Sequence, residues 1–422
     1  MDQFTETAET TSTSFFQAGK LGELLDRWQP HPELVSIGTA MLVGILTGIG
    51  AVLFRYLIDG VAWIGYEWIP AVSSGLGKSY IIIVPALGGL LVGLLIYYFA
   101  REAKGHGVPE VMEAVALKGG RIRPRVAVVK SFASSITIGS GGSAGREGPI
   151  VQIGSAIGST VGQALNLADD RISNLVACGA AAGIAATFNA PIAGVIFALE
   201  VILGRFSVRY FSTVVVASVA ASVIGRVALG DLPAFVIPFE YGINSLWEFL
   251  FYPILGILAA FFGVFFTRSL YWSEDLFDKF ERVPEWFKPA IGGALLGVLA
   301  FAYPLIRLAQ PVTWTNIPQV FNVGYDVIES ALANELAFSA AFILLLAKII
   351  ATNLTLGSGG SGGVFAPSLF MGAMLGAAFE LLVNRLFPGV AAPPGAYALV
   401  GMAALFAAAG HAPITAVIIL FE

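Results

Sequence analysis

Uncharged, mainly apolar stretches follow one another along most of the chain. A helix that crosses a bilayer needs about 20 consecutive, predominantly apolar residues. Runs that reach or approach this length occupy residues 36–54, 79–100, 148–168, 174–199, 249–267 and 289–306. This pattern predicts an all-α polytopic membrane protein.

Two further uncharged runs, residues 349–379 and 387–421, are too long for single spans and are interrupted by glycine and proline. They predict broken helices or half-helices that meet inside the membrane. Irregular backbone at that depth is tolerated only where it is buried in protein or lines a watery cavity. The pattern therefore favours a transport protein.

Composition agrees with lipid as the solvent. Hydrophobic residues make up 57% of the chain and charged residues 12%, about half of the usual 25%, which excludes a water-soluble enzyme. The net charge of −5 gives no sign of a nucleic-acid partner. One cysteine and three histidines predict no disulfide framework, metal or other cofactor. An intramembrane enzyme stays an alternative, but the sequence offers no nucleophile with a base and no metal cluster.

Basic residues cluster in one short connection, which the positive-inside rule places in the cytoplasm: Lys118, Arg121, Arg123, Arg125 and Lys130. The polar lead-in, residues 1–34, has no signal-peptide pattern. We expect insertion through the first hydrophobic helix, into a plasma membrane or a bacterial inner membrane.

The chain contains an internal repeat. Residues 139–149 (GSGGSAGREGP) and 357–367 (GSGGSGGVFAP) are identical at 7 of 11 positions, at an offset of 218. Residues 179–200 and 401–422 share 11 of 22 positions at an offset of 222. Two ordered matches at nearly one offset predict a duplicated membrane unit.

The repeat divides the chain into a first membrane repeat (35–230), a linker (231–244) and a second membrane repeat (245–422). The apolar segment 211–225 has no counterpart after Glu422. We therefore expect a chain that lacks the last helices of its second repeat. Duplicated transporters commonly place their site at the repeat interface, where helix N-termini face an anion.

The glycine-rich loops predict such helix N-termini. Their glycines cluster just before proline, which at a first helical turn lacks an N–H that would be unpaired anyway. The remaining free N–H groups and the helix dipole favour an anion. The alternative is that these glycines only let helices pack closely.

Glu147 lies between these glycines and prolines, and its repeat mate is the apolar Phe365. A carboxylate at membrane depth is a functional hypothesis by default. We predict that Glu147 occupies the anion position and is displaced when it is protonated or outcompeted. The alternative is a structural bridge to Arg146.

Three motifs in order resemble the CLC family of voltage-gated chloride channels and chloride/proton exchangers: GHGVP (105–109), GREGP (145–149) and GVFAP (363–367). The resemblance runs from about residue 35 to the end. It implies a CLC-type inverted-repeat architecture of broken and tilted helices, and a homodimer in the bilayer with one pore per subunit. Chloride or another small anion is the implied transported ligand, with protons as a second one in exchangers.

The resemblance also implies the site residues. Glu147 resembles the gating glutamate of the family. The implied anion site consists of His106, Gly107, Arg146, Glu147, Gly148, Val364 and Phe365. His106 stands where the family has a serine: a neutral imidazole donates one N–H, and a protonated one adds charge and pH dependence. Alternatively His106 turns away and only backbone binds.

Two more departures bear on function. Family exchangers carry a glutamate directly after the position of Glu200, and this chain has Val201, which implies a channel-like protein; an antiporter is the alternative. Glu200 has the repeat mate Glu422, so we expect it to pair helix ends in both halves. The family's last-helix tyrosine and the regulatory domain that often follows are not in these 422 residues.

Overall fold

The computed structural model describes residues 32–72, 74–206, 208–231, 235, 237, 242–302 and 317–422. In this part of the chain the regular structure is helical, as the hydrophobic pattern predicts, and β-pairing is confined to isolated bridges. Eight of the described helices are long and apolar enough to cross a membrane. They are α2 (Pro32–Trp63), α4 (Tyr80–Phe99), α8 (Asp169–Phe188), α10 (Val208–Leu229), α11 (Glu248–Asp278), α12 (Lys288–Ala302), α14 (Phe338–Gly357) and α15 (Phe365–Leu386).

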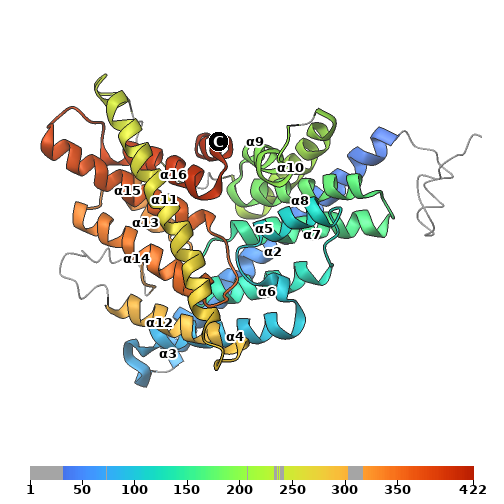
Figure 1. Cartoon of the computed structure of the whole chain (residues 1–422), viewed down its shortest axis with the longest axis horizontal. Helices are drawn as coiled ribbons and strands as arrows, with labels where there is room; N and C mark the ends of the chain where they lie inside the picture. The colour runs from blue at the N-terminus through green and yellow to red at the C-terminus, as the bar shows by residue number, and fades with distance from the viewer. Residues whose placement is uncertain are drawn as a thin grey trace, which may run out of the picture.

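Shorter helices complete the two halves: α3 (Ile69–Val72), α5 (Val108–Leu117), α6 (Arg125–Gly139), α7 (Glu147–Ala164), α9 (Pro191–Phe197), α13 (Tyr325–Leu332), α16 (Pro394–Gly410) and α17 (Pro413–Phe421). The last four residues of the predicted run 289–306 lie outside the described residues. The first half and the second half lie side by side, green-blue and orange-red in Figure 1.

The two longest runs are broken helices, as predicted. Residues 358–364 separate α14 from α15. His411 separates α16 from α17 in the left-handed conformation, at φ +52°. Its repeat mate Asn189, at φ +58°, separates α8 from α9 in the same way. A left-handed residue ends a helix cleanly, so the duplication extends to the positions of the breaks.

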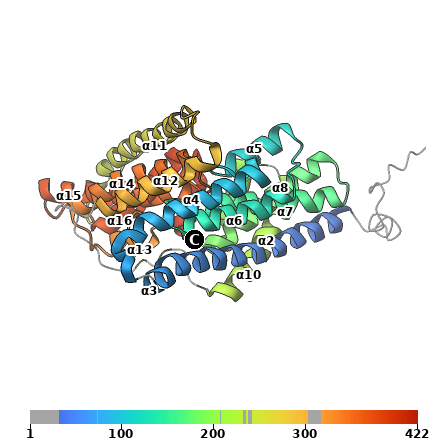
Figure 2. The ribbon, with the colours of Figure 1, turned by 90° about the horizontal axis from the view of Figure 1, so that it is seen from below.

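The apolar helices differ widely in how much of their surface the rest of the protein covers. The apolar segments of α8 and α15 are 83% buried in the molecule, whereas that of α11 is only 22% buried. In Figure 2, α11 and α2 lie on opposite sides of the molecule, with α4, α6, α12 and α14 between them. Other helices therefore cover α8 and α15, whereas most of the apolar surface of α11 faces outward.

The two halves meet where α4 crosses α12. A Cβ atom added to Gly89 would lie 2.1 Å from the carbonyl oxygen of Pro289, and one added to Gly293 would lie 2.1 Å from that of Pro85. Only glycine permits this approach of two backbones. Close packing thus accounts for these glycines.

Glu200 and Glu422 pair helix ends reciprocally, as expected. The Glu200 carboxylate accepts the backbone N–H groups of Ile414 and Thr415, at 3.1 and 2.8 Å, at the start of α17. The Glu422 carboxylate accepts those of Ile192 and Ala193, at 2.9 and 2.8 Å, at the start of α9. Each glutamate therefore caps a helix of the other repeat, where the N-terminal dipole favours negative charge.

Candidate anion site between the repeats

Three helix N-termini converge between the repeats. Arg146 directly precedes α7, Val364 directly precedes α15, and Gly107, at φ +90°, precedes α5. Gly145 and Gly363 bond to each other twice: the N–H of each donates to the carbonyl oxygen of the other at 2.7 Å. The two glycine-rich loops are thus joined backbone to backbone, as repeat-related elements meeting at a pseudo-twofold axis.

The third terminus packs against the first without room for a side chain. A Cβ atom on Gly148 would lie 2.3 Å from the carbonyl oxygen of His106, and one on Gly107 would lie 2.9 Å from that of Gly148. Together with the Gly145–Gly363 pair, these contacts bring all seven sequence-predicted residues into one place. Their roles in binding an anion stay predictions.

Hydroxyl groups hold each loop to the opposite repeat. The Ser361 N–H donates to Thr137 Oγ1 at 3.2 Å, and the Ser143 N–H donates to Thr355 Oγ1 at 3.0 Å. These two bonds are repeat mates, because 137 and 143 lie 218 positions before 355 and 361. Neutral hydroxyl oxygens thus accept the hydrogen bonds of these buried backbone N–H groups.

Lys130 requires a correction to the predicted cytoplasmic cluster. It lies in α6 and is fully buried, and its Nζ donates to the carbonyl oxygen of Gly105 at 2.8 Å. Lys348 in α14 is also fully buried and donates to the carbonyl oxygen of Asn322 at 2.8 Å. Since burying a cation requires such acceptors, each lysine fixes the segment that leads into a short helix, α5 or α13. Sequence reasoning missed Lys348.

Glu147, the first residue of α7, is fully buried. Its Oε1 accepts a hydrogen bond from the Tyr325 hydroxyl at 2.5 Å and lies 4.0 Å from Arg146 Nε. Among the described residues, no group donates a hydrogen bond to Oε2. The direct partner of the carboxylate is thus Tyr325, which sequence reasoning missed, and the bridge to Arg146 is long.

The Glu147 carboxylate folds back toward the second repeat. A Cβ atom on Gly145 would lie 2.2 Å from Glu147 Oε2 and 3.0 Å from the backbone nitrogen of Ala366 in the first turn of α15. The carboxylate therefore occupies the small space between the starts of α7 and α15. The first four N–H groups of a helix have no partner within that helix, so a negative charge is stabilised there.

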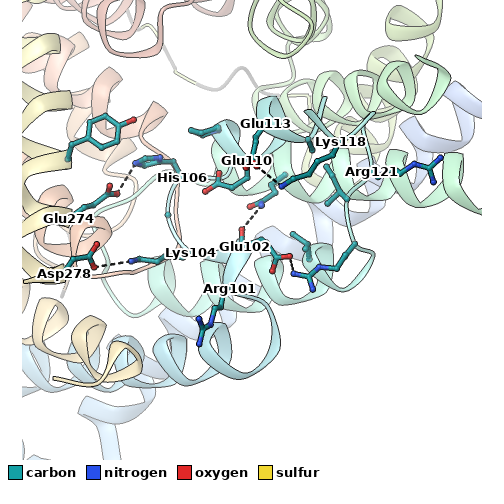
Figure 3. A pocket seen from close by; sticks show the side chains of 18 residues that line it. Arg101, Glu102, Lys104, His106, Glu110, Glu113, Lys118, Arg121, Glu274 and Asp278 are labelled. Atoms are coloured by element: carbon teal, nitrogen blue, oxygen red, sulfur yellow. Dashed lines mark hydrogen bonds and ion pairs between the residues drawn. The ribbon is translucent and has the colours of Figure 1, made fainter. Parts of the chain in front are cut away.

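A cavity of about 790 Å³ opens beside His106 (Figure 3). Three of the predicted basic residues, Lys118, Arg121 and Arg123, line it. Side chains of opposite charge are paired around it: Figure 3 shows Lys104 with Asp278 and Lys118 with Glu113, and Arg123 pairs with Glu102. Because acidic and basic side chains are paired, the wall of the cavity is nearly balanced in net charge.

The His106 imidazole faces α11. Its Nε2 lies 3.6 Å from Glu274 Oε1, and its ring stands edge-on to Tyr271, with the centroids 6.3 Å apart. Burial, and after it the charge of Lys130, lowers the pKa of His106 from 6.5 to about 4. Desolvation is the larger of the two causes. His106 is therefore a neutral imidazole near pH 7.

We expect His106→Ser to alter the chloride/nitrate selectivity of transport while leaving its pH dependence unchanged between pH 6 and 8. With a pKa near 4, only about 1% of the imidazole is charged at pH 6, so its titration contributes nothing above that pH. Anion flux from liposomes with each anion, over this pH range, measures both quantities. An altered pH profile between 6 and 8 would contradict the neutral imidazole, and unchanged selectivity would reduce His106 to packing.

The comparisons with known proteins identify the family. Residues 88–422 match the family model described as "Voltage gated chloride channel". The chain belongs to the CLC family. Its members are anion channels and transporters rather than enzymes. This chain, which has eight long apolar helices among its described residues, is an integral multi-pass membrane protein.

The relatives include proteins named as chloride channels and proteins named as exchange transporters. The chain is 32% identical to the putative chloride channel protein ClcB-like of Ralstonia nicotianae, over 92% of this chain and 88% of that protein. It is 32% identical to the H(+)/Cl(−) exchange transporter ClcA of Vibrio cholerae, over 91% and 80%. It is 33% identical to chloride channel protein CLC-e of Arabidopsis thaliana, over 93% of this chain but only 57% of the plant protein.

Solved structures have the same fold. A slow cyanobacterial Cl−/H+ antiporter superimposes with a TM-score of 0.78 at 26% identity, covering 93% of this chain and 89% of the other. A CLC-type fluoride/proton antiporter superimposes with a TM-score of 0.76 at 24% identity, over 92% and 90%. The CLC-type inverted-repeat architecture expected from the three motifs is thereby confirmed.

Proposed function

We propose that this protein moves chloride, or a similar small anion, across a membrane through a pathway that Glu147 gates. The observation that carries this proposal is the position of the Glu147 carboxylate, fully buried between the starts of α7 and α15. Helix N-termini favour an anion. A carboxylate in that place competes with the transported anion for the same N–H groups.

The proposed route begins in the cavity beside His106 and continues past the helix N-termini. The neutral imidazole of His106 and the backbone N–H groups of Glu147, Gly148 and Phe365 are the donors that would hold the anion. Neutral donors suit a conducting site, because binding must be weak enough for the ion to leave. As the family resemblance implies, two copies would assemble, each with its own pathway.

Passive, channel-like conduction is the first candidate. Val201, in the π-helical turn Ala198–Ile202, packs partly buried against the main apolar core. A valine cannot take up a proton, so this position offers no acceptor for protons coming from the cytoplasmic side. Anion flow would then depend only on whether Glu147 blocks the pathway.

Exchange of chloride against protons is the second candidate. His106 Nε2 and Glu274 Oε1 lie 3.6 Å apart on the wall of the cavity beside His106. Two titratable groups in contact can relay a proton, and ClcA of Vibrio cholerae, a relative at 32% identity, is named an exchange transporter. In this candidate, His106 and Glu274 accept the protons that the family's glutamate accepts at the position of Val201.

The deciding experiment reconstitutes the protein in chloride-loaded liposomes and records chloride efflux and proton movement together under a pH gradient. Chloride efflux without proton uptake supports the channel. Proton movement in fixed proportion to chloride supports the exchanger, and its loss in Glu274→Gln would identify the His106–Glu274 pair as the entry point. Folded protein that releases no anion, above the rate of empty liposomes, would overturn the proposed function itself.

A further inference from the structure

Tyr325 occupies a position where the two repeats differ. Gly107, at φ +90°, is the residue before α5, and Gly324, at φ +83°, is the residue before α13. The two buried lysines anchor the segments leading into them in the same way. The first residue of the helix is Val108 in the first repeat and Tyr325 in the second.

Glu147 shows the matching difference, because its repeat mate is Phe365. The Glu147–Tyr325 contact thus joins two polar residues whose counterparts, Phe365 and Val108, are both apolar. Burying two apolar side chains here would cost less free energy than burying two polar ones, which is costly unless they are paired. The polar pair is therefore a feature of one side of the pathway only.

The Tyr325 ring is held on both sides. The guanidinium carbon of Arg146 lies 5.2 Å from its centroid, and the Phe235 ring packs edge-on with the centroids 5.1 Å apart. These contacts leave the hydroxyl directed at Glu147 Oε1, at 2.5 Å. A hydrogen bond from a hydroxyl to an ionised carboxylate is stronger than one to a neutral carboxyl group.

Tyr325 also borders a second cavity, of about 240 Å³, which is lined by residues from Ile317 to Val327. This cavity shares no lining residue with the one beside His106. Tyr325 thus contacts Glu147 and at the same time lines a cavity on a different part of the surface.

We propose that Tyr325 is a positioning residue that latches the Glu147 carboxylate in the anion position and sets the pH at which it releases. The inference rests on the proposed function of Glu147 as gate. A donor to the charged form stabilises that form; a protonated carboxyl is a weaker acceptor, so protonation loosens the latch. Charged and titratable groups on the elements around Glu147 are Arg146, Arg55 and Asp59 of α2, Lys348 of α14, Asp326 and His106.

The test is Tyr325→Phe, which keeps the ring against Arg146 and Phe235 and removes only the hydroxyl. We expect the midpoint of the pH dependence of anion flux to move upward by about 1 pH unit, as for the loss of one hydrogen bond to a charged group. Flux at pH 7.5 rises in the same variant. The matched control is Tyr66→Phe, because the buried Tyr66 hydroxyl donates to Ser140 at 2.6 Å and has no contact with Glu147; its midpoint stays in place.

Combining Tyr325→Phe with Glu147→Gln tests the role of Tyr325 separately from the gating role of Glu147. In Glu147→Gln, adding Tyr325→Phe should change the pH profile no further. If Glu147→Gln abolishes the pH dependence but Tyr325→Phe alone does not shift the midpoint, Tyr325 does not position the carboxylate, whereas Glu147 still gates the pathway. If Glu147→Gln keeps the wild-type pH dependence, the gate itself is wrong. Should Tyr325→Phe fail to fold, as judged by its melting temperature in detergent, Tyr325→Leu replaces it and must shift the midpoint at least as far.

Discussion

Replacing Glu147 with alanine is expected to give an anion pathway that stays open at every pH and moves no protons. The carboxylate is fully buried between two helix N-termini, so its removal leaves those N–H groups free for the anion. Below its midpoint, a carboxylate loses its charged form about tenfold for each pH unit, and the variant lacks this response. Chloride efflux and proton uptake, recorded over pH 5 to 8, measure both effects.

The control for this prediction is Glu113→Ala. Glu113 is half exposed in the cavity beside His106 and pairs with Lys118 at 2.9 Å. The substitution therefore removes an equal charge away from the start of α7. Its pH profile should match that of the wild type. Proton movement that persists in Glu147→Ala would show that another group carries the protons, and a preserved pH dependence would show that another group gates the anion.

Substitution by alanine is expected to affect transport differently at two nearby glycines, Gly145 and Gly148. At Gly145 the nearest atom to a new Cβ is Glu147 Oε2, at 2.2 Å, the mobile end of a side chain. We expect Gly145→Ala to expel the carboxylate, with Ala366 giving way slightly, and so to weaken the pH dependence of flux. At Gly148 the nearest atoms are backbone, with the His106 carbonyl oxygen at 2.3 Å. We expect Gly148→Ala to separate α5 from α7 and to abolish transport.

The two variants are also expected to differ in stability, because the new Cβ meets a side chain in one and backbone in the other. Overpacking against backbone destabilises a protein by about 1–3 kcal/mol, and sometimes more, so the melting temperature of Gly148→Ala falls, whereas that of Gly145→Ala changes little. Gly50→Ala on α2 is the control, because a Cβ there meets nothing closer than 3.6 Å. Wild-type pH dependence in Gly145→Ala, or normal transport by Gly148→Ala, would contradict the geometry of the site.

The repeat made much of this arrangement predictable. Two matches at offsets of 218 and 222 placed Glu147 opposite Phe365 and Glu200 opposite Glu422. The glycine–proline pattern located the starts of α7 and α15, because those residue types have direct conformational meaning. The reciprocal capping by Glu200 and Glu422 followed from the same symmetry.

The partners of the site were not predictable in the same way. Tyr325 lies 178 positions from Glu147, and only the packing of one repeat on the other brings them together; no motif or periodicity marks it. Glu274 reaches His106 for the same reason, from the end of α11. Lys130 follows a run of basic residues along the chain, but α6 turns it inward to the carbonyl group of Gly105, which sequence neighbours do not reveal.

Chloride binding itself tests the central claim most directly. Calorimetric titration of chloride into the purified wild type and Glu147→Gln, at pH 7.5 and at pH 5, compares the affinity with and without a competing carboxylate. The account predicts that Glu147→Gln binds chloride more tightly at pH 7.5, and that only the wild type gains affinity when the pH is lowered. Equal affinities in the two proteins, unchanged by pH, would show that Glu147 does not occupy the place of the anion.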